Sequence, residues 1–187
     1  MNRRTVLSLV AATAATQGLP RISSAQTSTF ESTGLGLTIS DWEDKFGPGE
    51  PGQTYTSFPL DNGNFWVGTA GDNRAVDYIE RNYADPNGVA LADAQQEAVT
   101  LIPGDARLVE SFVANYAAIL HGSQIDRYQS KTLPAQFKGD AARSYTRNFV
   151  IMYELAPAPA AFDYFVTRYA IIAGTKPNNL AVRSARQ

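Results

Sequence analysis

The chain has 187 residues, of which 44% are hydrophobic, 11% aromatic and 18% charged, and its formal net charge is −2. This length fits one domain plus an appendage, and the apolar share exceeds that of a disordered chain. Scattered lysines and arginines and a mildly acidic balance argue against nucleic-acid and anionic-membrane partners. Because there is no cysteine, disulfides, thiolate chemistry, cysteine-bound metals and a lipidated cysteine anchor are all excluded.

Residues 1 to 25 have the pattern of a cleaved signal peptide. Arg3 and Arg4 precede the uncharged stretch TVLSLVAATAAT, and the small residues Ser23 to Ala25 predict cleavage after Ala25. NRRTVLS resembles the twin-arginine export motif, and a general secretory signal is the alternative. Cleavage removes three of the 16 basic side chains and leaves 13 against 18 acidic ones, a net charge near −5. We therefore expect export to the periplasm, cell envelope or exterior, without membrane insertion of the mature chain.

The mature chain is predicted to consist of a flexible Ser, Thr and Gly-rich lead-in over residues 26 to 36, a single domain over 37 to 177 and a tail over 178 to 187. The predicted domain begins with a short helix. Ser40 fits its N-cap, and Glu43 lies three residues later, where a capping box requires a carboxylate.

The same stretch is acidic, but it does not require a catalytic explanation. A helix dipole stabilises carboxylates in the first turn, so Asp41 and Glu43 need no metal or acid–base role. Phe46 and Gly47 fit the last turn and the residue that ends the helix.

A β-hairpin is predicted next. Asn62-Gly63 stands between two β-prone stretches and indicates a type I′ turn that joins strands over 55 to 60 and 65 to 69. The run from Ala75 to Tyr83 fits a strand or a helix, and its Val, Ile and Tyr content favours a third strand. ALADAQQEAVTLIP predicts a helix that stops at Pro103 and whose apolar side carries Leu91, Ala94, Ala98 and Ile102.

The second half of the chain is rich in strand patterns. RLVESFVANYAAIL and QIDRYQS each predict a strand, and KTLPAQF predicts a turn or short helix. NFVIMYEL predicts a strand with one face made of Phe149, Ile151, Tyr153 and Leu155. In FDYFVTRYAII, one predicted face carries Tyr164, Val166, Ala170 and Ile172, and the opposite face carries Phe165, Tyr169 and Ile171. Because both faces are apolar, this strand should lie inside the sheet. APAPA between these two strands predicts a stiff connection.

These elements together predict an α+β fold with short helices on one face of a mainly antiparallel sheet. The order of GLTISDWEDKFGPGEP, the hairpin, LIPGDARLV, YQSKTL and AGTKPNN resembles a group of uncharacterised exported bacterial proteins. It is also similar to the helix-then-meander unit of the small outer-membrane assembly lipoproteins and of the β-lactamase inhibitor protein. The resemblance implies a module whose sheet binds other proteins, and it carries over no site residue. Without a cysteine after the signal peptide, the lipid anchor of the lipoproteins is impossible.

Motifs for catalysis or cofactor binding are missing from the sequence. There is no P-loop, Rossmann glycine motif, zinc-protease motif, nucleophile elbow or EF-hand loop, and the single histidine excludes multi-histidine metal sites. His121 and Ser123 bring an imidazole and a hydroxyl close in sequence, but we interpret them as part of a loop. We interpret the DNGN, GDN and DPNG stretches as turns rather than as calcium ligands. We interpret Asp105 as part of a turn or cap rather than as an acid catalyst. No catalytic residue, metal ligand or cofactor is predicted.

Aromatic residues are the remaining candidates for function. The chain has 9 tyrosines, 9 phenylalanines and 2 tryptophans. Those on or beside predicted strands form either a core or an exposed binding face, and the candidates for that face are Trp66, Tyr153, Tyr164 and Tyr169, with Phe65 beside them. We expect an exported, soluble, non-enzymatic module that binds another exported or envelope protein. The alternatives are a small-ligand binder with a pocket between helix and sheet, and a hydrolase that uses two carboxylates.

Overall fold

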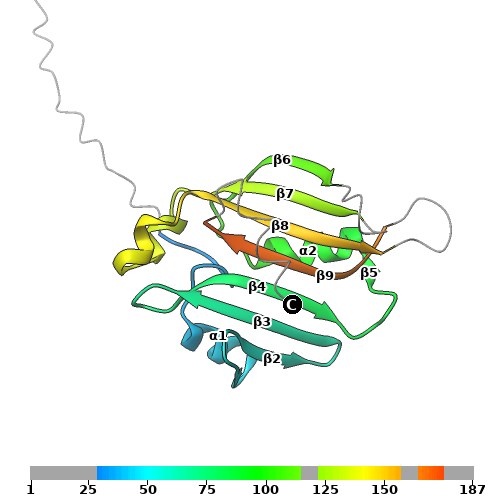
Figure 1. Cartoon of the computed structure of the whole chain (residues 1–187), viewed down its shortest axis with the longest axis horizontal. Helices are drawn as coiled ribbons and strands as arrows, with labels where there is room; N and C mark the ends of the chain where they lie inside the picture. The colour runs from blue at the N-terminus through cyan, green and yellow to red at the C-terminus, as the bar shows by residue number, and fades with distance from the viewer. Residues whose placement is uncertain (1–28, 115–121, 157–163, 175–187) are drawn as a thin grey trace, which may run out of the picture.

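The computed structural model describes residues 29–114, 122–156 and 164–174 (Figure 1). The predicted signal peptide, His121, most of the APAPA connection and the 178 to 187 tail lie outside the described residues. The described part confirms the α+β prediction: two α-helices accompany one nine-stranded sheet in which every pairing is antiparallel.

The sheet has the order β1-β2-β3-β4-β9-β8-β7-β6, and β5 pairs with β9. Its strands are β1 (Glu50–Pro51), β2 (Thr56–Leu60), β3 (Gly63–Ala70), β4 (Ala75–Tyr83), β5 (Val89–Ala90), β6 (Arg107–Ala114), β7 (Ser123–Gln129), β8 (Asn148–Ala156) and β9 (Phe165–Ala173). The strand prediction for Ala75 to Tyr83 is therefore confirmed. The interior position of the last strand is also confirmed, because β9 lies between β4 and β8.

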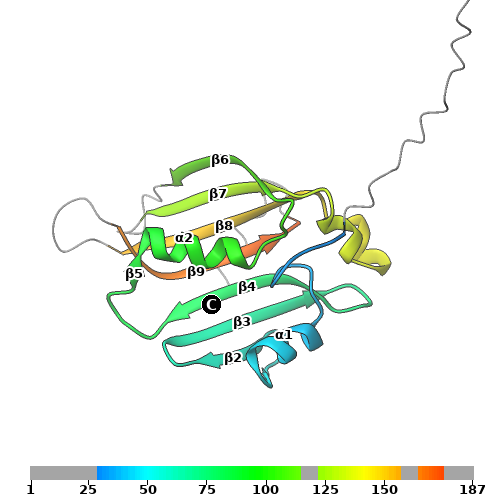
Figure 2. The same ribbon diagram turned by 180° about the vertical axis from the view of Figure 1, so that it is seen from behind.

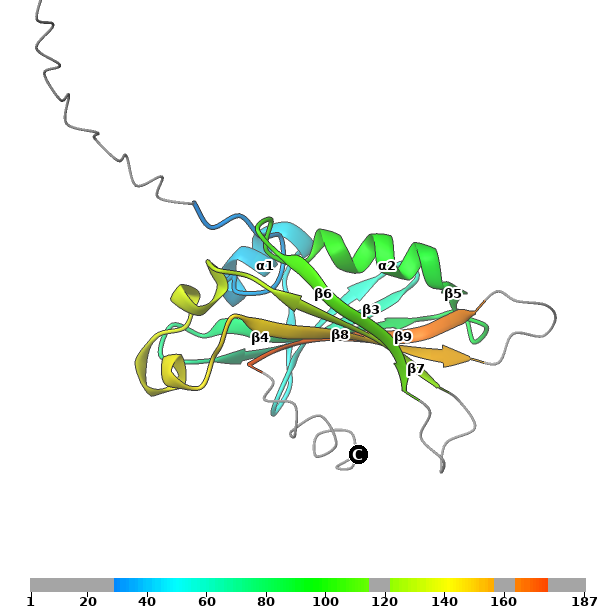
Figure 3. The ribbon, with the colours of Figure 1, turned by 90° about the horizontal axis from the view of Figure 1, so that it is seen from above.

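Both α-helices, α1 (Ile39–Phe46) and α2 (Leu91–Thr100), lie on the same side of the sheet (Figure 3). Seen from behind, α2 crosses β8 and β9, whereas α1 lies near β2 (Figure 2). Ala94 and Ala98 are fully buried, and such small side chains let the α2 backbone approach the strands closely. Two short 3₁₀ helices, η1 (Leu133–Gln136) and η2 (Gly139–Arg143), connect β7 to β8. The side opposite α1 and α2 is called the open face below.

The first helix is capped two residues earlier than predicted. Thr38 is the N-cap and exchanges hydrogen bonds with Asp41, which completes the capping box expected from Ser40 and Glu43. Threonine and aspartate satisfy the same free backbone N–H groups as serine and glutamate. The local sequence was therefore compatible with a capping box that begins at Thr38 and with one that begins at Ser40. The end of the helix at Phe46, followed by Gly47, is confirmed.

The hairpin also differs from its prediction by one residue. Leu60 pairs with Gly63, so the loop residues are Asp61 and Asn62 instead of Asn62 and Gly63. A type I′ turn needs positive φ at both central residues, and Arg74 is the only non-glycine residue in the described chain with positive φ. The type I′ prediction is therefore wrong. Gly63 has φ +133°, and an added Cβ would lie 1.9 Å from the Asn82 carbonyl oxygen, so this position requires glycine.

The predicted flexible lead-in is wrong for its described part. Leu35 is fully buried, its backbone N–H donates to Leu101 O at 2.7 Å, and Gly36 N–H donates to Val76 O. Lead-in residues therefore pack between the end of α2 and strand β4. Their Ser, Thr and Gly composition indicated mobility, but the fixing contacts are non-local and could not be predicted from composition.

Candidate interaction surface

One cross-strand row of residues crosses the open face from β1 to β6. Antiparallel partners point to the same side of a sheet, so the pairings define the row directly. In order, it contains Glu50, Ser57, Trp66, Glu80, Ala170, Met152, Ile125 and Phe112. The row is polar with one tryptophan at the β1 end and apolar from Ala170 to Phe112, and two of its members, Glu80 and Ile125, are buried. Of the predicted aromatic candidates, it contains only Trp66.

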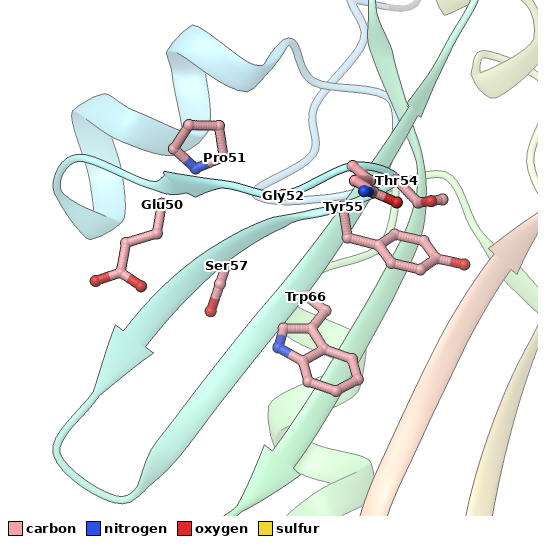
Figure 4. Close-up of a pocket in the computed structure, with 8 residues that line it drawn as sticks. Glu50, Pro51, Gly52, Thr54, Tyr55, Ser57 and Trp66 are labelled. Carbon is pink, nitrogen blue, oxygen red and sulfur yellow. The ribbon is translucent and has the colours of Figure 1, made fainter. Parts of the chain in front are cut away.

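The β1 end of this row forms a groove with a volume of about 440 Å³. Figure 4 shows Glu50, Ser57 and Trp66 projecting to the same side of three neighbouring strands, with the Tyr55 ring beside the Trp66 indole. The other lining residues belong to the connection between β1 and β2, and the full lining is Glu50, Pro51, Gly52, Gln53, Thr54, Tyr55, Ser57 and Trp66. We call this site the Trp66 groove.

The two tryptophans of the chain have opposite environments. Trp42 on α1 is 1% exposed, packs against Phe46, Phe58 and Phe65, and donates its indole N–H to Gly34 O at 3.1 Å. Trp66 is partly exposed, and among the described residues it has no ring partner and its indole N–H has no hydrogen-bond acceptor. Trp42 therefore has the contacts of a core residue, whereas Trp66 keeps an apolar ring and a donor available.

A polar network lies beside the groove on the same face. The Tyr78 hydroxyl donates to Glu80, and Arg168 pairs with Glu154 and lies 3.9 Å from the second oxygen of Glu80. Burial, followed by the bond to Glu80, raises the pKa of Tyr78, so this hydroxyl stays protonated as a donor. Tyr55 packs against Tyr78 with the rings tilted and their centroids 5.0 Å apart, which links this network to the groove wall.

Tyr153 and Tyr169 do not contribute to an exposed aromatic face. They are 0% and 1% exposed and lie on the helix-covered face, with their ring centroids 5.9 Å apart. The cross-strand row that contains them is Phe58, Phe65, Arg81, Tyr169, Tyr153, Gln124 and Val113. Neither tyrosine hydroxyl has a hydrogen-bond partner among the described residues. The expectation that all four candidates share one binding face is therefore wrong, and Tyr164, 53% exposed, lies just before β9.

The predicted faces of β9 also need a correction, because this strand contains a bulge. The register shifts between Glu154 and Leu155, which pair with Arg168 and Val166, so Thr167 is the extra residue of β9. Val166 and Tyr169 are consequently both buried on the helix side, although strict alternation placed them on opposite faces.

The helix-covered face also holds a buried cation. Arg81 is 1% exposed, and its Nε donates to Glu97 on α2 at 3.1 Å while its Nη1 donates to Asn82 O at 2.6 Å. The guanidinium lies 4.4 Å from the Tyr83 ring centroid, and the Tyr83 hydroxyl donates to Glu97 at 2.5 Å. These contacts join α2 to the sheet. Their roles are structural, since both charges have partners within the fold.

Asp105 is a loop cap, in agreement with its interpretation from sequence. Its carboxylate accepts bonds from the Ser130 hydroxyl, from the backbone N–H groups of Lys131 and Thr132, and from the Thr132 hydroxyl. Burial acts to raise the pKa of Asp105, but these hydrogen bonds outweigh it and hold the pKa below its ordinary value. Within the described residues, no group of three His, Asp or Glu side chains is placed to hold a metal ion. No helix of that part is long and apolar enough to cross a membrane.

Comparison of the chain with protein-family models, curated proteins and solved structures finds no match. The functional argument therefore depends on the surfaces of this chain itself. Sequence analysis singled out Trp66 but missed the rest of the groove. The prolines and glycines of PGEPGQTY are typical of an irregular connection, but only the pairing of β1 with β2 and of β2 with β3 places that connection against the tryptophan.

Proposed function

We propose that this protein is an exported, non-enzymatic interaction module that binds a segment of another protein in the Trp66 groove. The observation that carries the proposal is the difference between the two tryptophans, because only Trp66 lacks partners in the described chain. Tryptophan, tyrosine and arginine dominate the energetics of protein interfaces. The groove supplies Trp66 and Tyr55 as rigid apolar surfaces.

The polar groups around the ring suit a peptide chain. Glu50, Gln53, Thr54 and Ser57 line the groove with a carboxylate, an amide and two hydroxyls. A peptide segment offers backbone N–H and C=O groups that match such a lining, while one of its apolar side chains packs against the indole. Small-molecule sites usually enclose most of the ligand surface, whereas this groove lies on the outer part of a sheet.

The test starts with site-specific photo-cross-linking in the native host, using the whole chain with its own leader. A photoreactive residue at Thr54, on the groove wall, should give one dominant protein adduct. The same residue at Asp44, exposed on α1, is the matched control and should not give that adduct. With the purified partner, Trp66→Ala should weaken binding about 30-fold or more, the loss typical of an interface hot spot. Identical adducts from both positions, or unchanged affinity of the Trp66→Ala variant, would contradict the proposal.

A further inference from the structure

Exposed apolar residues concentrate on strand β6. The exposed large hydrophobic residues of the described chain are Val99, Leu108, Val109, Val113 and Tyr164, and three of these five belong to β6. This strand ends the sheet order and pairs only with β7 within the described residues. Its other edge therefore presents backbone N–H and C=O groups that have no strand partner there.

The two edges of the sheet are built differently. At the opposite edge, β1 has only two residues, one of them Pro51, and the adjacent β2 contains Pro59. Short strands and prolines are common devices that prevent an edge from pairing with another chain. β6 has eight residues and no proline. The β6 edge thus lacks the protection that the β1 edge has.

The side chains of β6 are suited to pairing with a copy of themselves. Register places Val113 opposite Gln124 on the helix-covered face and Phe112 opposite Ile125 on the open face, so both faces of the strand carry an apolar side chain. The strand carries one arginine, Arg107, and one glutamate, Glu110, and because Glu110 already pairs with Arg127 of β7 at 2.8 Å, the strand presents no uncompensated carboxylate to a second copy. A bulge between Leu108 and Glu110 leaves residues 110 to 114 as the regular stretch for pairing.

We propose that the protein forms a dimer in which the β6 edges of two copies pair antiparallel about a two-fold axis. Such an interface uses the same patch on both chains, so a single contact covers both unprotected edges. A strand of a different protein would cover the β6 edge of only one copy. The inference is independent of the Trp66 groove, because the groove lies at the β1 end of the sheet. The dimer would place two grooves at the far ends of one continuous sheet, which allows bivalent binding.

The first test is the mass of the purified mature protein by sedimentation equilibrium from about 1 µM to about 200 µM, a range over which mass action separates monomer from dimer. Wild type should reach twice the mass of one chain. Val109→Lys/Val113→Lys should remain monomeric with an unchanged circular dichroism spectrum, since lysine protects natural edges. Val99→Lys/Tyr164→Lys is the control, because it adds the same two charges at similarly exposed apolar residues outside β6. A wild-type monomer throughout, or a dimer that the β6 variant retains, would overturn the proposal.

A second measurement locates the contact. The chain has no cysteine, so one introduced thiol is the only thiol present. Val113→Cys should form an intermolecular disulfide on mild oxidation, because positions near the two-fold axis of an antiparallel pair approach their own copies. Gln53→Cys, exposed at the opposite edge, should not. Cross-linking through Gln53→Cys alone would contradict a β6 interface and would place the contact between copies at the wall of the Trp66 groove.

Discussion

Removal of the Glu97 carboxylate should cost more stability than removal of a similar carboxylate at the surface. Glu97 is the counter-ion of Arg81, whose side chain is 1% exposed, and it also accepts the Tyr83 hydroxyl. Truncating one partner of a buried ion pair leaves a buried charge without compensation, at a cost of about 3 to 5 kcal/mol. Glu97 itself is 34% exposed, and water would reach part of the vacated space. We therefore expect Glu97→Ala to cost about 3 kcal/mol, the lower end of this range.

Glu154→Ala is the matched control for burial. Glu154 pairs with Arg168, but the two side chains are 40% and 44% exposed, so water can hydrate the remaining guanidinium. Exposed pairs of this kind contribute about 0 to 1 kcal/mol. The two variants thus make the same substitution in an ion pair, and they differ in solvent access to the arginine and in the Tyr83 hydroxyl bond, which only Glu97 accepts.

Urea unfolding followed by tryptophan fluorescence measures both costs, because Trp42 is buried in the core. For a domain of this size, a 3 kcal/mol loss also lowers the melting temperature by roughly 6 to 12 °C. Equal unfolding free energies for the two variants would refute the reasoning, since burial would then not determine the cost. A changed urea dependence would show that the variant alters the unfolded or native ensemble, and the comparison would then use only the thermal data.

Two further predictions concern buried polar groups. Tyr153→Phe and Tyr169→Phe should leave the unfolding free energy unchanged or raise it by up to about 1 kcal/mol, because their hydroxyls are buried and have no hydrogen-bond partner in the described part of the chain. Tyr83→Phe should lower the unfolding free energy by about 1 to 3 kcal/mol, because its hydroxyl donates to Glu97. A loss above about 1 kcal/mol in either the Tyr153→Phe or the Tyr169→Phe variant would reveal a bound water or ligand at the hydroxyl. The pKa of Asp105 is lower in the folded chain than in the unfolded chain, where it is about 4, so the ionised carboxylate stabilises the fold above this pH. This contribution is lost as the pH falls through the pKa that Asp105 has in the folded chain. Asp105→Asn should therefore reduce stability at pH 7 but flatten its decline under acid, and a pH series of urea midpoints that runs parallel to wild type would contradict this.

Local signals allowed correct prediction of most elements. Capping chemistry explains the helix stop at Gly47, and helix propensity explains the helix over Leu91–Thr100. Alternation of apolar residues explains the strands around Ile151 and Ile171. The errors are small local shifts. The capping box moved by two residues because threonine and aspartate took the roles expected of serine and glutamate, whereas the hairpin loop moved by one residue and is not a type I′ turn.

The candidate site could be predicted only in part, because exposure depends on pairings between distant strands. Tyr153 and Trp66 both follow an alternating pattern, and nothing local shows which face α2 will cover. The bulge at Thr167 changes the face of Val166 relative to Tyr169, and no sequence pattern near it marks the extra residue. Arg81 illustrates the same limit, since its counter-ion is 16 residues away on a helix.

The arrangement of the two faces suggests why the chain tolerates an exposed tryptophan and an exposed edge. Both helices, the Trp42 cluster and the Arg81 ion pair all lie on one side of the sheet, where they provide its core. A sheet stabilised from that side does not depend on Trp66, which has no ring partner in the described chain, or on Val109 and Val113, which are about half exposed. Substitutions of these residues should consequently change binding or assembly with little change in unfolding free energy. Loss of folding in the Trp66→Ala variant would instead assign Trp66 to the core and remove the basis of the groove proposal. Loss of folding in the Val109→Lys/Val113→Lys variant would do the same for the proposed dimer.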